Sequence, residues 1–191
     1  PLTVISFSLA MVIAIITALV QFANIRVLKQ IARFYIWVVR GTPLLVQLFV
    51  VFYGLPDIGI VLDPFPAAII VFSINEGAYC AETMRAALEA VPAGQMEAGY
   101  CVGMSYLQII RRIVLPQALR TAFPPLSNSL ISMVKDTSLA RIISIMELTK
   151  VGESYIKAQG ITWPLFYTGV FYLAFVGLLT LPVSYTHLTL P

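Results

Sequence analysis

Long apolar segments alternate with short polar segments along the whole chain. The first, from Leu2 to Phe22, carries no charge and exceeds the ~20 residues that a membrane-crossing helix needs. Later apolar segments begin near Pro43, Phe65, Pro125 and Trp163, and the last ends near Val183. Hydrophobic residues make up 59% of the chain and charged residues 11%, which is far from the composition of a soluble domain. The pattern predicts an all-α membrane protein with about five transmembrane helices.

The charged residues indicate which polar segments lie on which side of the membrane. Segment 24–40 contains four basic residues and no acid, which by the positive-inside rule predicts a cytoplasmic location and a first helix that enters from outside. Segment 55–66 holds two acids, three prolines and no base, which is typical of an external turn. Segment 146–160 mixes both signs and predicts a second external segment, with a helix lying on the membrane surface.

The second apolar segment is short for a span. Thr42 and Pro43 predict an N-cap and a first-turn proline, and about thirteen residues then rise only ~20 Å against a hydrocarbon core of ~30 Å. Either the span begins upstream near Ile36 and breaks at Gly41, or it enters a thinned or protein-lined region. The pattern leaves both possibilities open.

Segment 92–116 interrupts the apolar pattern with small and polar residues. Pro92 is expected to open a short helix whose positive end Glu97 complements, and Gly103 to stop it. Ser105 and Gln108 have the spacing of a capping box for a second helix, 106–114, which Leu115 and Pro116 are expected to end. Two short helices that meet at a glycine predict a compact surface for a partner.

This segment resembles the cytoplasmic coupling loop of ABC importer permeases. The signature of that loop is Glu-Ala-Ala, a glycine four residues later, and then an apolar residue and Leu-Pro. Here it reads Glu97, Ala98, Gly99, Gly103, Ile113, Leu115 and Pro116, with Gly99 in place of the second alanine. The motifs RGTPLLVQ at 40–47, NEGAY at 75–79, LPQA at 115–118 and KDTSL at 135–139 are similar to the polar amino-acid branch of the family.

The resemblance implies a type I ABC importer permease fold in the bacterial plasma membrane. It also implies a polar amino acid as substrate, a second permease subunit of the same or another kind, an external solute-binding protein, and ATPase subunits that hold ATP and Mg. The residues expected to couple the permease to the ATPase are Ala93, Glu97, Ala98, Gly99 and Gly103. The chain has no phosphate-binding loop and no catalytic constellation, so we expect neither an enzyme nor a cofactor or metal site in it.

Polar residues inside the apolar segments predict the substrate pathway. Glu76 lies ~16 Å along the third helix from Phe65, and counting from Pro125 places Lys135 and Asp136 at a similar depth. The candidate pathway residues are Asn75, Glu76, Tyr79, Lys135, Asp136 and Ser138. An alternative is that these charges only hold the helices together, as we expect for Glu82 and Arg85, which have the spacing of a structural ion pair near the cytoplasmic end.

Two other functions are compatible with intramembrane charges. A secondary carrier would use them as a proton relay, and a scaffold without a transported ligand would use them as contacts between helices. We expect a permease domain over 1–183 and regard 184–191 as a doubtful tail, truncated or foreign. The first residue is Pro1, which suggests that upstream residues are missing.

Overall fold

The computed structural model describes residues 1–22 and 25–189, and the side chains up to residue 182. This part of the chain forms helices and turns and no strand, which confirms the all-α prediction. The α-helices are α1 Leu2–Phe22, α2 Arg26–Arg40, α3 Leu44–Phe49, α4 Pro64–Glu89, α5 Ala93–Cys101, α6 Tyr106–Ile109, α7 Leu115–Asp136, α8 Leu148–Gln159 and α9 Trp163–Thr189. Short π-helical turns span Val50–Gly54 and Ile110–Val114, and 3-10 turns span Leu55–Ile58 and Thr137–Ile143.

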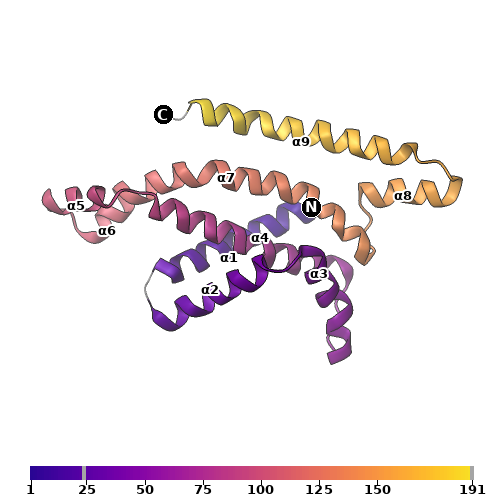
Figure 1. The fold of residues 1–191 in the computed structure, drawn as a ribbon, viewed down its shortest axis with the longest axis horizontal. Helices are drawn as coiled ribbons and strands as arrows, with labels where there is room; N and C mark the ends of the chain where they lie inside the picture. Colours follow the sequence, from indigo (N-terminus) through magenta and orange to yellow (C-terminus); the bar gives the residue numbers. More distant parts are fainter. Residues whose placement is uncertain (23–24, 190–191) are drawn as a thin grey trace.

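The long helices run nearly side by side along the longest axis of the molecule (Figure 1). Helices α5 and α6 lie at one end of this bundle and α8 at the other, in agreement with the predicted opposite sides for segments 92–116 and 146–160 (Figure 1). Helices α1 and α4 run in the same direction. Their first residues meet, since Leu2 packs in one cluster with Ala67, and their last turns meet, since Gln21 and Arg85 line one cavity.

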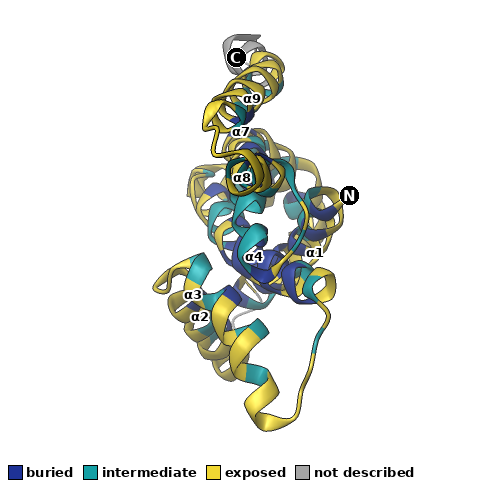
Figure 2. Cartoon of the chain, turned by 90° about the vertical axis from the view of Figure 1, so that its right-hand side faces the viewer, coloured by how far each residue is buried: buried dark blue, intermediate teal, exposed yellow. Residues whose placement is uncertain are grey.

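Small residues allow α1 and α4 to pack closely. Residues Ser6, Ala10, Ala14 and Ala18 are buried and recur every four positions, so they lie on one face of α1. Figure 2 shows the buried surfaces concentrated where α1 and α4 meet, whereas α9 is mostly exposed. The protein core therefore follows α1 and α4, and α9 lies at its edge.

The second apolar segment is a broken helix. Helix α2 and the helical segment 44–58 that begins with α3 meet at an angle of 100° around Gly41–Pro43, so the chain breaks at Gly41 as one of the two possibilities predicts. Thr42 Oγ1 donates to the Val38 carbonyl at 2.9 Å, and Gln47 Nε2 donates to the Val39 carbonyl at 2.8 Å. These side chains satisfy carbonyls that the break removes from the helix ladder, as a membrane interior requires. The predicted Thr42 cap is wrong, since Pro43 occupies the N-cap position and Thr42 bonds backwards.

Helix α2 packs against the bundle through its second half, which the predicted cytoplasmic segment 24–40 did not anticipate. Its buried residues Ile36 and Val39 pack with Ala14 of α1 and Ala78 of α4. The basic residues lie along a second face, next to the buried one, and Arg40 reaches Tyr79 of α4. Helix α2 therefore begins toward the end of the bundle that holds α5 and α6 and continues beside α1 and α4 (Figure 1); the cytoplasmic location of that end stays a prediction.

The segment around Leu115 continues as helix, contrary to prediction. Leu115 N–H donates to the Ile110 carbonyl, which closes a π-helical turn, and Gln117 Nε2 donates to the Ile113 carbonyl at 3.0 Å. Pro116 lies in the first turn of α7, where its missing N–H is not needed. The prolines at 124 and 125 lie inside α7, so the predicted start of this span at Pro125 is also wrong.

Five segments have the length of membrane spans. In the described part of the chain, α1 and residues 163–182 of α9 are long and apolar enough to cross a membrane, and the α2–α3 pair is a third if counted as one span. Helices α4 and α7 have 26 and 22 residues, but polar residues lower their mean hydropathy. Because they run beside α1 (Figure 1), we assign them as the other two spans. Helix α9 continues to Thr189, and the predicted division at 183 stays a prediction.

Candidate functional site

A polar cavity of about 760 Å³ lies where the α2–α3 break faces α4 and α7. All three segments line it, and most of the lining side chains are polar although we assign these segments to the membrane. The lining residues are Arg40, Gly41, Thr42, Pro43, Leu44, Asn75, Glu76, Tyr79, Thr83, Pro125, Asn128, Ser129, Ser132, Asp136 and Leu139. Polar and ionisable groups at membrane depth are costly unless they face protein or water. Their convergence therefore marks this cavity as the candidate site.

The carboxylate of Glu76 is the most buried acid of the site, with a relative exposure of 8%. Cys80 Sγ, one turn later on α4, donates to Glu76 Oε1 at 3.7 Å, and the Ser129 hydroxyl of α7 also interacts with this carboxylate. Asp136 contributes a second carboxylate from the end of α7. Helices α4 and α7 thus place two acids in one cavity, and Glu76 forms no ion pair with any described residue.

Asn75 connects α4 to the broken helix. Its Nδ2 donates to Gln47 Oε1 at 3.1 Å, and Gln47 in turn donates to the carbonyls of Val39 and Thr42. One side chain therefore caps the break and holds it against α4. Gln47 lies one turn into α3, from where its side chain reaches back across the bend to these carbonyls.

Arg40 supplies the positive charge of the cavity. Its guanidinium carbon lies 5.2 Å from the centroid of the Tyr79 ring, which is the geometry of a cation–π contact. Arg40 makes no salt bridge within the described part of the chain. Carboxylates from α4 and α7 and a guanidinium from α2 therefore line one polar space.

The structure brings together four of the six predicted pathway residues, namely Asn75, Glu76, Tyr79 and Asp136. Lys135 is exposed, and neither it nor Ser138 lines the cavity. The lining residues that the prediction missed are Arg40, Thr42, Thr83, Asn128, Ser129 and Ser132. The polar spacing at 128, 129, 132 and 136 follows one helical face and is the signal that identifies those on α7.

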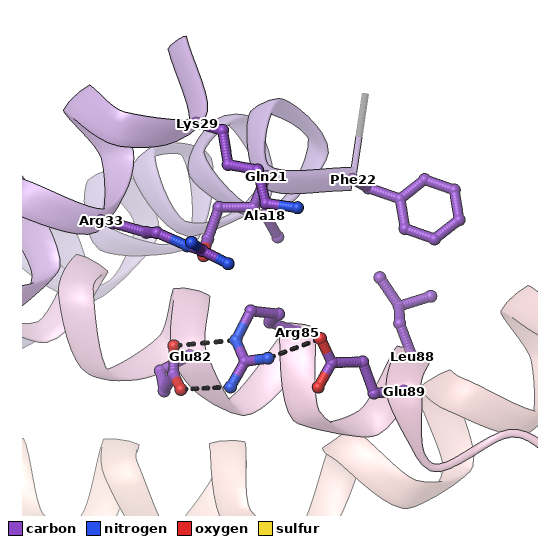
Figure 3. Close-up of a pocket in the computed structure, with 9 residues that line it drawn as sticks. All are labelled: Ala18, Gln21, Phe22, Lys29, Arg33, Glu82, Arg85, Leu88 and Glu89. Atoms are coloured by element: carbon purple, nitrogen blue, oxygen red, sulfur yellow. Dashed lines mark hydrogen bonds and ion pairs between the residues drawn. The ribbon is translucent and has the colours of Figure 1, made fainter. Parts of the chain in front are cut away.

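The predicted pair of Glu82 and Arg85 is confirmed as an ion pair. Arg85 donates through Nη2 and Nε to the two Glu82 oxygens at 2.6 and 3.1 Å, and through Nη1 to Glu89 at 2.5 Å (Figure 3). These residues line a separate cavity where α1 and α4 end and α2 begins. In the described part of the chain, no three His, Cys, Asp or Glu side chains are placed to hold a metal ion.

The candidate coupling surface is built around two glycines. A Cβ atom on Gly99 would lie 2.7 Å from Cγ1 of the fully buried Ile109, so even alanine would crowd the contact between α5 and α6. This explains Gly99 where the signature has alanine. Gly103 has φ of +78°, a backbone conformation that favours glycine, and the predicted Ser105–Gln108 capping box is present.

The outer surface of this tip exposes apolar side chains and an unpaired acid. Val102 and Leu107 have relative exposures of 75% and 73%, and the aromatic rings at 100 and 106 are about half exposed. Glu97 is exposed and forms no ion pair within the described residues. It lies in the second turn of α5, so the predicted contact with the positive helix end is wrong. An exposed apolar patch of this kind indicates a protein interface.

Comparison with known proteins identifies the family. Residues 10–186 match the family described as binding-protein-dependent transport system inner membrane component. The L-cystine transport system permease protein TcyB of Bacillus subtilis (strain 168) is 46% identical over 175 residues, which cover 85% of this chain and 75% of TcyB. The octopine transport system permease protein OccM of Rhizobium radiobacter is 43% identical over 165 residues, or 82% of this chain and 67% of OccM.

Solved structures of ABC transporters have a similar fold. The crystal structure of an amino acid ABC transporter with histidines superposes with a TM-score of 0.94 at 30% identity, and covers 99% of this chain and 89% of that chain. An inward-facing structure of the MetNI methionine ABC transporter has a TM-score of 0.80 at 20% identity, and supports the fold alone. The resemblance is thereby confirmed: the chain belongs to the binding-protein-dependent transport system inner membrane component family, as a multi-pass, non-catalytic permease subunit of an ABC transporter.

Proposed function

We propose that this permease carries a polar amino acid into the bacterial cell through the cavity between the α2–α3 break, α4 and α7. The single observation that carries the proposal is the convergence of two carboxylates and one guanidinium in a polar intramembrane cavity of about 760 Å³. That volume falls in the ~300 to 1,000 Å³ range typical of small-molecule sites. TcyB and OccM are permeases of an L-cystine and an octopine transport system, which supports the same class of substrate.

The charges of the cavity complement those of a zwitterion. The ammonium group of an amino acid would meet Glu76 or Asp136, and its carboxylate would meet Arg40, which replaces Lys135 in this role. The second acid then remains for a cationic side chain. Charge-assisted hydrogen bonds of this kind are strong in a space shielded from water. The four pathway residues that line the cavity retain this role, and we no longer assign one to Lys135 or Ser138.

The 92–116 loop is proposed to couple transport to ATP hydrolysis. Family membership implies an ATPase subunit and a binding protein as partners, and ATP and Mg belong to the ATPase. We assign the docking contacts to Glu97 and the exposed tip, with Ala93 and Ala98 as small residues that permit close approach. Gly99 and Gly103 maintain the shape of the tip through packing and backbone conformation. A second permease subunit, identical or different, completes the proposed assembly.

Reversal of the Glu97 charge tests the coupling surface. We expect Glu97→Lys to insert normally but to lose most ATPase copurification and substrate-stimulated ATPase activity, because the exposed acid lies outside the bundle. Lys157→Glu, an exposed charge reversal on α8 at the other end of the bundle, is the matched control and should copurify with the ATPase as the wild type does. Normal substrate-stimulated ATPase activity in Glu97→Lys would contradict the coupling role.

Uptake into proteoliposomes separates this function from the two alternatives. Import that requires the ATPase subunit and ATP supports the proposal, whereas uptake without an ATPase would indicate a secondary carrier, and the absence of uptake would indicate a scaffold.

The exposed Cys101 of α5 reports the orientation of the protein in the membrane. An impermeant maleimide should label it from the cytoplasmic side only, and labelling in intact cells would overturn the topology.

A further inference from the structure

A second cavity, of about 280 Å³, lies where α1 and α4 end and α2 begins, and shares no lining residue with the larger cavity. Figure 3 shows Gln21, Lys29 and Arg33 on one side of it and Arg85, held between Glu82 and Glu89, on the other. Phe22 and Leu88 form an apolar rim. The site therefore combines cationic groups with an apolar edge at the depth where a helix leaves the membrane.

The unpaired polar groups of this cavity are donors. Gln21 is only 6% exposed, and its buried Nε2 has no hydrogen-bond partner among the described residues. Lys29 and Arg33 form no salt bridge within the described part of the chain. Both Glu82 oxygens and one Glu89 oxygen already accept from Arg85. A buried donor without a partner is costly, so the cavity favours a ligand with hydrogen-bond acceptors, and the unpaired charges of Lys29 and Arg33 favour a negatively charged one.

The surroundings favour a lipid as the source of that ligand. Two exposed apolar residues lie beside the basic groups: Phe22 of the rim is 46% exposed, and Trp37, one turn after Arg33 on α2, is 72% exposed. A headgroup phosphate bound between Lys29 and Arg33 would leave its acyl chains against these side chains. Basic pockets between transmembrane helices on the cytoplasmic side have the chemistry that binds anionic headgroups.

We propose that this cavity binds the phosphate headgroup of an anionic phospholipid of the cytoplasmic leaflet, with Gln21, Lys29 and Arg33 as donors. The bound lipid would fix α2 against α1 and α4. The inference does not rest on the proposed substrate, because it concerns different residues at a different depth. It can therefore fail or hold independently of amino-acid transport.

Fluorescence quenching in the full-length protein tests the site directly. The chain has two tryptophans, so Trp163→Phe leaves Trp37, which lies one turn from Arg33 on α2, as the reporter. Brominated phosphatidylglycerol should quench Trp37 at a roughly tenfold lower mole fraction than brominated phosphatidylcholine, as the loss of one hydrogen bond to a charged group would predict. Equal quenching by the two lipids would overturn the proposal.

Three variants in this background separate the cavity from general surface charge. Gln21→Leu and Arg33→Gln should each reduce the preference for phosphatidylglycerol to near unity, whereas Arg26→Gln, an exposed charge of the same helix outside the cavity, should retain it. Equal losses in all three, or none in the first two, would refute the site.

Two further measurements complete the test. Because Gln21→Leu removes an unsatisfied buried amide, its thermal transition in phosphatidylcholine should match or exceed that of the parent protein, which shows that a lost lipid preference is not misfolding. Inorganic phosphate should displace the lipid only weakly. If phosphate binds through Arg33 while phosphatidylglycerol shows no preference, the site takes a soluble anion and the lipid assignment is wrong.

Discussion

Helices α4 and α9 are nearly equal in length, with 26 and 27 residues, but their surroundings are opposite. Helix α4 packs against α1, α2, α3 and α7, and its buried residues include Ser73, Asn75 and Glu76. The main neighbours of α9 are α7 and α8, and most of its described side chains are exposed and apolar (Figure 2). Acidic and amide side chains thus occur in the helix that protein surrounds, whereas residues 163–182 of the helix that faces outward carry no charged or amide side chain.

This difference explains why apolar content alone identifies one helix and not the other. Residues 163–182 meet the length and composition of a span, whereas α4 does not, although α4 lies at the centre of the fold. A carboxylate is tolerated where a cavity and neighbouring dipoles solvate it, and is costly in contact with lipid. The helix with the weaker membrane signal is therefore the one that carries the transport chemistry.

An acid placed on α9 should produce the largest effect. Leu173 lies about ten residues, or ~15 Å, into α9 and is 76% exposed, so Leu173→Glu would place a carboxylate in lipid near mid-membrane. Insertion scales put that cost at ~2.5 to 3.5 kcal/mol, which corresponds to a shift in the insertion equilibrium of about a hundredfold. Glycosylation mapping of α9 measures the inserted fraction directly.

The matched control is removal of the acid from α4. Glu76→Leu should insert at least as well as the wild type, because it takes a carboxylate out of the membrane. If Leu173→Glu inserts and assembles like the wild type, the exposed face of α9 does not contact lipid. A polar surface of the second permease subunit would then be the better interpretation of that face.

Neutralisation of the cavity charges should have the next largest effect. We expect Glu76→Gln, Asp136→Asn and Arg40→Gln each to reduce kcat/KM for uptake by tenfold or more, since each removes a charge-assisted bond of ~1.5 to 3 kcal/mol. Assembly with the ATPase should persist. Lys135→Met, which removes an exposed charge outside the cavity, is the control and should transport normally.

Two results would contradict the ligand role of these groups. Unchanged apparent affinity in the three variants would place the substrate elsewhere. Poor assembly of Glu76→Gln, with normal transport by the fraction that assembles, would show that Glu76 only holds α4 and α7 together. After either result, α4 and α9 would differ in how they pack and not in a role in substrate binding.

Much of the fold follows from local patterns. The limits of α1, the start of α4, the Glu82–Arg85 ion pair and the Ser105–Gln108 capping box were predicted to within a residue, because each depends on neighbours in the sequence. The two short helices that meet near Gly103 were predicted for the same reason, and their role in coupling stays a prediction.

The failures have separate physical causes. Pro116 was expected to end a helix and Pro125 to begin one, but the helix continues through both, and near Pro116 a π-helical turn and the Gln117 side chain satisfy part of the backbone. The contact of Arg40 with Tyr79 joins two helices, so the local pattern could not show it. Lys135 and Asp136 are neighbours in the sequence at nearly the same depth, but only Asp136 lines the cavity, so the depth count alone could not separate them.

We expect the smallest effect from glycine to alanine changes, which should raise the stability of the protein in α9 and lower it in α4. A Cβ on Gly169 of α9 would meet nothing within 4 Å, so Gly169→Ala should stabilise the helix by roughly 0.5 to 1 kcal/mol. A Cβ on Gly77 of α4 would lie 2.9 Å from Ile13 Cγ2 and 3.1 Å from Ile13 Cβ. Gly77→Ala should therefore destabilise the protein by about 1 to 3 kcal/mol through overpacking.

Thermal unfolding of the two variants in the same detergent shows whether each alanine raises or lowers the stability. Tyr35 makes Gly77 more sensitive, because its hydroxyl would lie 3.2 Å from the new Cβ while it donates to the Ile74 carbonyl at 2.6 Å. Relief of the clash would have to move α1 or break this hydrogen bond. Equal stabilisation by both alanines would mean that α4 is packed as loosely as α9, and the contrast from which the intramembrane site was argued would fail.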